Sequence, residues 1–168
     1  MENKSSVLLI FTGGTISMGE NSSNHSLAPL DTKQVLSFIP ELQMLHVNIA
    51  SVSFSPLIDS SDIKPSNWVE IAGHIERHYN DFDGFVVLHG TDTMAYTASA
   101  LSFMLEGLDK PVILTGSQIP LSEVRSDGRD NLITSMLIAA EGRVLSSIFP
   151  VFVFGSFGGR SVHKLRKE

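Results

Sequence analysis

The stretch VVLHGTDTM, residues 86–94, decides the fold class of this chain. An apolar, β-branched run ends at Gly90, and three polar residues lead directly into a segment rich in helix formers. A buried strand that passes at once into a helix is typical of α/β proteins with a mainly parallel sheet. Thr91 or Asp92 can cap such a helix. Capping accounts for one of these polar residues and leaves the purpose of the other two open.

The same succession of apolar run and helix-like segment repeats along the chain. Apolar runs predict strands at residues 7–11, 46–54, 84–89, 111–116 and 148–154. Ser66 is expected to cap a helix whose apolar face runs from Trp68 to Tyr79. Residues 93–105 are apolar almost all round, which predicts a covered helix, and Asp127 is expected to cap a helix that ends near residue 140. The pattern predicts a single α/β domain over residues 1–168, with a mainly parallel twisted sheet covered by helices on both faces.

The composition is that of a compact soluble domain and argues against several classes of protein. The chain has 168 residues, of which 42% are hydrophobic and 18% charged. A formal charge of −6, with 12 Lys and Arg, argues against nucleic acid as a partner. The apolar run at residues 7–11 is too short for a signal peptide or a membrane span, so we expect no membrane partner and a cytoplasmic location. Cysteine is absent, which removes disulfides and thiolate metal sites.

Three histidines have both a functional and a plainer interpretation. His74 and His78 stand four residues apart, as in a helical metal-binding pair. No third ligand is visible nearby in the sequence, so a solvated helix face is favoured and no metal is predicted. His89, at the end of a strand, is favoured as a hydrogen-bonded, half-buried residue over a general base.

Polar residues gather where the predicted strands end. Ligands of open α/β sheets bind outside the carboxyl ends of the strands, and these ends deliver residues 12–15, 59–62, 90–93, 116–118 and 155–160. Plainer alternatives are a strand-to-helix turn at 12–15 and a polar turn at 59–62. Nucleotide binding is disfavoured, because the chain has neither a dinucleotide fingerprint nor the lysine of a phosphate loop. The sequence predicts that hydroxyls and carboxylates converge on one edge of the sheet.

Five motifs together resemble the bacterial-type L-asparaginase family, and most closely its cytoplasmic type I branch. They are FTGGTIS (11–17), DSSD (59–62), HGTDTM (89–94), TGSQIP (115–120) and RSDGRDN (125–131). The pairing of TGGTI with HGTDTM is the most specific feature, and the match covers nearly the whole chain. The resemblance implies hydrolysis of L-asparagine to L-aspartate and ammonia by a homo-oligomer that needs no cofactor.

The resemblance also implies roles for individual residues. Thr15 and Thr91 match the essential hydroxyls of the family. Asp92 and Lys164 complete a Thr–Lys–Asp arrangement, although a solvated basic tail is the plainer interpretation of the segment that contains Lys164. Ser60 matches the residue that holds the substrate's α-carboxylate, with Ser61 beside it, and Asp92 is expected to bind the α-ammonium group. The Thr91 amide and the backbone near Ser117 are the expected donors to the oxyanion.

Elementary chemistry constrains these roles. A threonine hydroxyl is a weak nucleophile at neutral pH and needs a neighbouring base. An ammonium group cannot accept a proton, so Lys164 must be neutral to act as that base, and burial is the usual cause of neutrality. A covalent acyl–threonine and direct activation of water by the hydroxyls both remain open.

The chain departs from the family pattern in three places. Leu27 stands where many members have a catalytic Tyr, and residues 154–159 replace strand-end polar residues. The smaller C-terminal domain of the family, which completes the oligomer and its sites, is expected to be absent. An alternative function is therefore a truncated, catalytically inactive fragment that at most weakly binds small amino acids.

Overall fold

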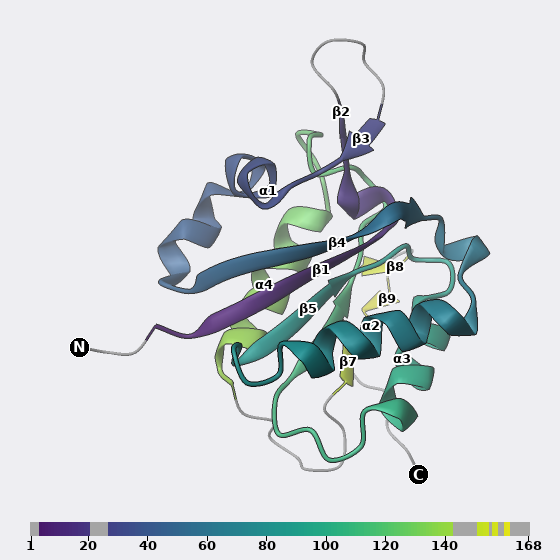
Figure 1. Cartoon of the computed structure of the whole chain (residues 1–168). Coiled ribbons are helices and arrows are strands. Elements are labelled where there is room, and N and C mark those ends of the chain that lie inside the picture. Colours follow the sequence, from purple (N-terminus) through teal and green to yellow (C-terminus); the bar gives the residue numbers. More distant parts are fainter. Residues whose placement is uncertain (1–3, 21–26, 143–150, 155, 158–159, 162–168) are drawn as a thin grey trace.

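The computed structural model describes residues 4–20, 27–142, 151–154, 156–157 and 160–161. A parallel sheet forms its centre (Figure 1). The strands described in this sheet are β1 (Ser6–Gly13), β4 (Asn48–Ile58), β5 (Gly84–Leu88), β6 (Val112–Thr115) and β7 (Val151–Phe154). Their order is β4-β1-β5-β6-β7, and every neighbouring pair is parallel. The predicted parallel sheet is confirmed, although residues 148–150 of the last predicted strand lie outside the described residues.

Helices cover both faces of this sheet, because successive side chains of a strand point to opposite faces. Leu8 and Ile10 of β1 enter a core with buried residues of α2 (Pro65–Arg77) and α3 (Met94–Met104). Leu9 and Phe11 enter a second core with α4 (Gly128–Ala140), α1 (Thr32–Phe38) and the 3-10 helix η2 (Pro40–Leu45). Each such fully buried side chain contributes roughly 1.5–3 kcal/mol. Figure 1 shows α2 and α3 in front of the sheet and α4 behind it.

The segment between β1 and β4 contains elements that the apolar pattern did not predict. The 3-10 helix η1 (Thr15–Ser17) is followed by an antiparallel pair, β2 (Met18–Glu20) and β3 (Leu27–Pro29). Helix α1 begins with a capping box, in which the Asp31 carboxylate accepts from the Gln34 backbone and the Gln34 side chain accepts from the Asp31 backbone. The remaining elements are η3 (Ser60–Asp62), β8 (Ser156–Phe157) and β9 (Arg160–Ser161).

Two expectations about helices were wrong. Helix α2 begins at Pro65 rather than after a Ser66 cap, and the Asn67 side-chain oxygen accepts from the Lys64 amide at 2.8 Å. Proline suits the first helical position because its missing N–H would have no intrahelical partner. Helix α3 is covered on one side only in the described part of the chain, since Tyr96 is 70% exposed while Leu101 is fully buried.

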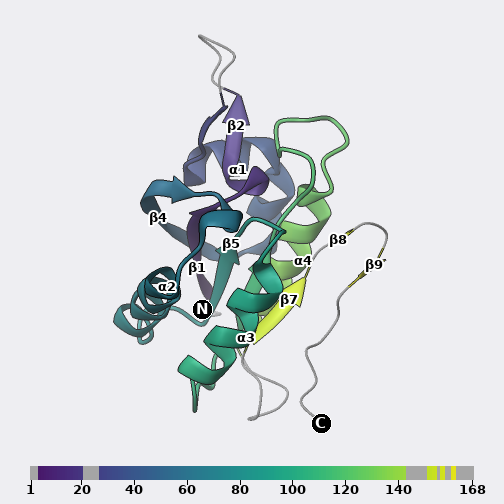
Figure 2. The ribbon, with the colours of Figure 1, turned by 90° about the vertical axis from the view of Figure 1, so that its right-hand side faces the viewer.

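The strand order places a switch point at β1. From β1 the chain goes to β4 on one side of it, and then to β5 on the other side. Ligands of open α/β sheets bind where neighbouring connections diverge in this way, outside the carboxyl ends of the strands. Figure 2 faces this edge, and the loop that leads from β6 into α4 lies at its upper right, in green. The topology therefore predicts a ligand site at the turns that follow β1 and β5.

Candidate active site

The turns that follow β1 and β5 touch each other at the switch point. Gly13 and Gly14 have φ angles of 143° and 76°, which glycine adopts without steric cost. A side chain at Gly14 would overlap the backbone of Gly90. This close approach brings Thr15, which begins η1, to the turn that carries Thr91.

The loop after β4 joins the same turn through Ser60. Ser60 is 5% exposed, and its hydroxyl oxygen would lie 2.5 Å from a Cβ added at Gly90. The Ser60 carbonyl accepts a hydrogen bond from the Thr93 hydroxyl at 2.7 Å. The Thr93 hydroxyl therefore joins two loops, and it makes no capping hydrogen bond to α3.

Ser61 is engaged differently from Ser60. Its backbone N–H and its hydroxyl both donate to Oδ1 of Asp59, each at 2.9 Å. These hydrogen bonds, the backbone one foremost, hold the pKa of Asp59 below its usual range. Asp59 and Ser61 are both exposed. Ser60 faces the turn after β5, whereas the Ser61 hydroxyl is occupied by Asp59.

The Thr91 hydroxyl contacts the loop after β6. Nε2 of Gln118 donates a hydrogen bond to Oγ1 of Thr91 at 3.0 Å. Gly116 permits this approach, because an added Cβ would lie 2.5 Å from the His89 carbonyl oxygen and 3.2 Å from Thr91 Cγ2. Gln118 was not among the predicted site residues. Its signal in the sequence is its place directly after Gly116 and Ser117 in the TGSQIP motif.

Ser117 is buried beside this contact. It is 3% exposed, and its hydroxyl has no hydrogen-bond partner among the described residues; the same holds for the Thr115 hydroxyl at the end of β6. A buried polar group without a partner costs about 1–3 kcal/mol. A polar ligand that reached Ser117 would therefore gain a hydrogen bond with a group already removed from water.

The remaining predicted catalytic residues are placed only in part. Asp92 follows Thr91 at the start of the turn into α3 and is exposed. Lys164 lies outside the described residues. Leu27 begins β3, opposite Glu20 of β2. The structure thus brings together Thr15, Thr91 and Ser60, while the Lys164 prediction stays untested.

Asp127 has a different role from the predicted helix cap. Its side chain makes no capping hydrogen bond to α4. Instead, its carboxylate accepts from the backbone N–H of Gln118 at 3.1 Å and of Ile119 at 3.0 Å. The helix still begins at Gly128, as predicted to within a residue. The carboxylate binds two N–H donors of an exposed loop in place of the helix start, and no local sequence pattern identifies these donors.

His89 is buried and fully hydrogen-bonded. It is 1% exposed; its Nδ1 lies 2.6 Å from the Gly90 carbonyl oxygen and its Nε2 lies 2.9 Å from Oγ1 of Thr97. A carbonyl only accepts, so Nδ1 bears the proton and Nε2 accepts from Thr97, which in turn accepts from Nε1 of Trp68 at 3.0 Å. Burial lowers the pKa of His89, against the opposing effect of its hydrogen bond with Gly90. The interpretation as a hydrogen-bonded histidine is confirmed, with deeper burial than predicted.

His74 and His78 do not form part of a visible metal site. The rings are stacked with centroids 6.4 Å apart, and Nδ1 of His78 donates to the His74 carbonyl at 2.9 Å. The described residues contain no group of three or more His, Cys, Asp or Glu that could hold a metal ion. None of the described helices is both long and apolar enough to span a bilayer.

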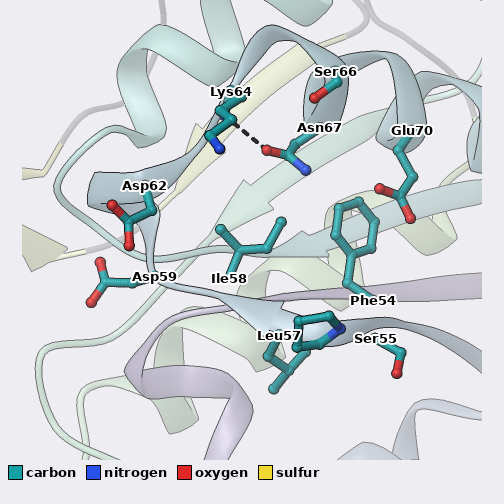
Figure 3. A pocket seen from close by; sticks show the side chains of 11 residues that line it. Phe54, Ser55, Leu57, Ile58, Asp59, Asp62, Lys64, Ser66, Asn67 and Glu70 are labelled. Atoms are coloured by element: carbon teal, nitrogen blue, oxygen red, sulfur yellow. Dashed lines mark hydrogen bonds between the residues drawn. The ribbon is translucent and has the colours of Figure 1, made fainter.

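A cavity of about 470 Å³ lies beside the loop after β4 (Figure 3). Figure 3 shows Asp59 and Asp62 on one side of it and Lys64 and Asn67 on another. Its lining is Phe54, Ser55, Pro56, Leu57, Ile58, Asp59, Asp62, Lys64, Ser66, Asn67 and Glu70. None of the hydroxyls at the switch point lines it. This cavity is therefore an outer hollow next to the site rather than the place where those hydroxyls meet.

We call residues 12–15, 59–62, 90–93 and 116–118 the strand-end cluster. Its members at the switch point of the sheet include the hydroxyls of Thr15 and Thr91, the buried Ser60 and the exposed carboxylate of Asp92. Hydroxyls are potential nucleophiles when a base is near. Backbone N–H groups at strand ends and helix starts suit a developing oxyanion. The arrangement suits acyl transfer on a small polar substrate.

Comparisons with known proteins give the family of this arrangement. The protein-family model for the N-terminal domain of asparaginases matches residues 6–166. L-asparaginase 1 of Escherichia coli (strain K12) is 50% identical over 138 residues, which are 82% of this chain and 41% of that protein. The chain therefore spans about two fifths of the length of this relative.

Solved structures agree with the sequence match. L-asparaginase I from Vibrio cholerae superposes with a TM-score of 0.77 at 42% identity, over 95% of this chain and 46% of that chain. A probable cytoplasmic L-asparaginase from Campylobacter jejuni superposes with a TM-score of 0.70 at 30% identity, over 89% and 44% of the two chains. With its mainly parallel sheet and its strand-end cluster, this chain belongs to the asparaginase family, and it corresponds to the family's N-terminal domain.

Proposed function

We propose that the chain is an amidohydrolase that converts L-asparagine to L-aspartate and ammonia. The observation that carries this proposal is the contact between Gly14 and Gly90, which brings the Thr15 and Thr91 turns together at the switch point. Family membership supports the same reaction, because the chain is similar to proteins named L-asparaginase. The proposal needs no cofactor, since the hydroxyls, a base and backbone donors suffice for amide hydrolysis.

Four residues are proposed to act on the amide. Thr15 and Thr91 supply the hydroxyls, Lys164 in its neutral form accepts a proton, and Asp92 orients the lysine amine. The charge of Asp92 opposes neutralisation of Lys164, so this aspartate needs a second cation. The substrate's α-ammonium group is that cation, and its binding favours the neutral lysine. Both a covalent acyl–threonine and direct attack of an activated water remain consistent with this set.

Substrate binding is proposed for Ser60, Ser61, Asp92 and Ser117. Ser60 and Ser61 stand at the start of η3, where backbone and hydroxyl donors suit a carboxylate. Ser60 is the stronger candidate, since the Ser61 hydroxyl already donates to Asp59. The backbone near Ser117 and the Thr91 amide are the proposed donors to the oxyanion.

Ammonia release from L-asparagine tests the proposal. The chain should release ammonia, with slower or absent release from L-glutamine, and Thr91→Ala should abolish it while circular dichroism shows an intact fold. Thr134→Ala, on α4, is the matched control and should retain activity. Absence of turnover by the folded wild-type chain at high concentration would refute the hydrolase proposal.

A second candidate function is binding of small amino acids without turnover. It is favoured by Leu27, because leucine has no hydroxyl and stands at the position where many members of the family carry a catalytic Tyr. Calorimetric binding of L-aspartate without ammonia release would support it. We further propose that residues 1–168 form one α/β domain, that the protein is a homo-oligomer, and that it acts in the cytoplasm.

A further inference from the structure

The residues just before α4 form several hydrogen bonds with the residues that follow β6. The Asp127 carboxylate accepts from the backbone N–H groups of Gln118 and Ile119. The Ser126 hydroxyl donates to the Ile119 carbonyl at 2.8 Å and accepts from the Gly128 N–H at 3.1 Å. Asp127 therefore binds two N–H donors of residues 118–119, and Ser126 binds the carbonyl acceptor of Ile119. These hydrogen bonds restrict the conformational freedom of the backbone at Gln118.

A buried hydrogen bond also fixes the backbone at the end of β6. Asn131 is 4% exposed, and its Nδ2 donates to the Gly116 carbonyl at 2.9 Å. Gly128 allows α4 to approach the loop, because an added Cβ would lie 2.9 Å from Cβ of Ser117. The backbone is thus fixed on both sides of Ser117. The RSDGRDN motif was interpreted from the sequence as a helix start. Its side chains also form the hydrogen bonds that fix the loop after β6.

The fastened loop ends in one contact with the proposed reaction centre. The Gln118 side chain donates an N–H from Nε2 to Oγ1 of Thr91 at 3.0 Å. A threonine hydroxyl has one proton and two acceptor lone pairs. Because Gln118 occupies a lone pair, the hydroxyl proton is left to point toward another acceptor. A base that removes this proton meets no competition from Gln118.

We propose that Gln118 sets the direction of the Thr91 hydroxyl proton, and that Asp127 is a positioning residue that acts through Gln118. The proposal rests on the proposed hydrolase function. Proton removal from Thr91 Oγ1 then leads from the hydroxyl to the base, while Gln118 donates to the oxygen throughout and stabilises the negative charge that develops on it. Loss of Asp127 frees the backbone of the loop and lets the Gln118 amide leave this position.

The polarity of the contact is tested by Gln118→Glu, which keeps the shape and replaces the donor with an acceptor. The carboxylate competes for the Thr91 proton, so kcat should fall about tenfold or more with little change in KM. Gln118→Met, which keeps the length and removes the hydrogen bond, should reduce kcat by about three- to tenfold. Gln43→Glu, an exposed change of the same charge on η2, is the control and should leave kcat unchanged. Wild-type kcat in Gln118→Glu would overturn the proposal.

A double-mutant cycle tests the role of Asp127. Asp127→Asn should lower kcat in the wild-type background and have little further effect in Gln118→Met, because both changes remove the same contact. Equal fold-losses in both backgrounds would show that Asp127 supports the fold without acting through Gln118. Urea unfolding of each variant separates loss of stability from loss of rate.

A readout without turnover separates this proposal from the hydrolase proposal. In ¹H–¹⁵N spectra, Thr91→Val should move the side-chain NH₂ signals of Gln118, and Asp127→Asn should move the backbone amides of Gln118 and Ile119. These shifts are expected even if the wild-type chain releases no ammonia, a result that refutes the hydrolase alone. Unchanged signals in both variants would overturn the proposed contacts whatever the activity.

Discussion

The Thr93 hydroxyl donates a hydrogen bond to the Ser60 carbonyl at 2.7 Å and thereby joins the loops that follow β5 and β4. Thr93→Val keeps the shape of the side chain and removes this donor. We expect a loss of about 1 kcal/mol in the free energy of unfolding and a raised KM for L-asparagine, because Ser60 loses its support. Urea unfolding and steady-state kinetics measure the two effects. Ser99→Ala is the control, because the Ser99 hydroxyl donates to the Ala95 carbonyl within α3, and it should change neither quantity appreciably.

Gly90 is required by its contact with Ser60 rather than by its backbone angles. A Cβ at this position would lie 2.6 Å from Cβ of Ser60, a distance that forces one of the loops to shift. Gly90→Ala should therefore cost about 1–3 kcal/mol of stability and reduce substrate binding. Gly73→Ala is the matched control in α2, where an added Cβ meets only the end of Arg77 at 3.9 Å. It should stabilise the protein by about 0.5–1 kcal/mol, and a similar loss in both variants would contradict the proposed contact.

Burial of His89 makes the stability of the fold depend on pH. Burial lowers the pKa of His89 in the folded chain below the ordinary value of 6.5. Between these two pKa values the imidazole is protonated in the unfolded chain and neutral in the folded chain. The free energy of unfolding should therefore fall as the pH drops from 6.5 toward the lowered pKa, and this contribution is complete above pH 6.5. Urea unfolding at pH 7.5 and 5.5 should show a smaller difference for His89→Gln than for the wild type. The lowered pKa of His74 affects both proteins equally. Equal differences in the two proteins would contradict the role of His89.

The proposed role of Lys164 rests on the G-R-x-V-x-K pattern at residues 159–164. Lys164→Met should abolish ammonia release without changing the melting temperature, because the substitution removes the proposed base and keeps most of the side-chain length. Lys167→Met, three residues away, is the control and should retain activity. Ammonia release by Lys164→Met at the wild-type rate would show that another group accepts the proton.

The sequence predicted the sheet and the edge where the strand-end cluster lies, because both follow from local patterns. Strands such as β5 consist of apolar, β-branched residues, and the polar residues after them must lie at the carboxyl edge of a parallel sheet. The contacts between these segments could not be predicted in the same way. The hydrogen bond from Gln118 to Thr91 joins residues 27 positions apart, and it depends on how α4 meets the loop after β6.

Asp127 and Ser66 show why the capping roles expected for two side chains were wrong. Asp127 is a good N-cap residue by type, but its carboxylate binds two loop N–H groups nine and eight residues earlier. Ser66 also fits the cap pattern, but Pro65 already occupies the first helical position of α2. At Asp127 the deciding partners lie eight and nine residues away, so the local pattern does not contain them. At Ser66 the deciding residue, Pro65, is adjacent in the sequence and outweighs the cap pattern.

The most direct test of the strand-end cluster is a ¹H–¹⁵N titration of the chain with L-aspartate, the proposed product. Binding at the switch point should shift the backbone amides of residues 12–15, 59–62, 90–93 and 116–119. The amides of Glu76, Tyr79, Asn80 and Leu108, which line a different surface hollow, should stay unchanged. Thr93→Val should weaken these shifts at a given concentration of ligand. Saturating shifts confined to residues outside the strand-end cluster, or none at high millimolar ligand, would contradict an amino-acid site at this edge of the sheet.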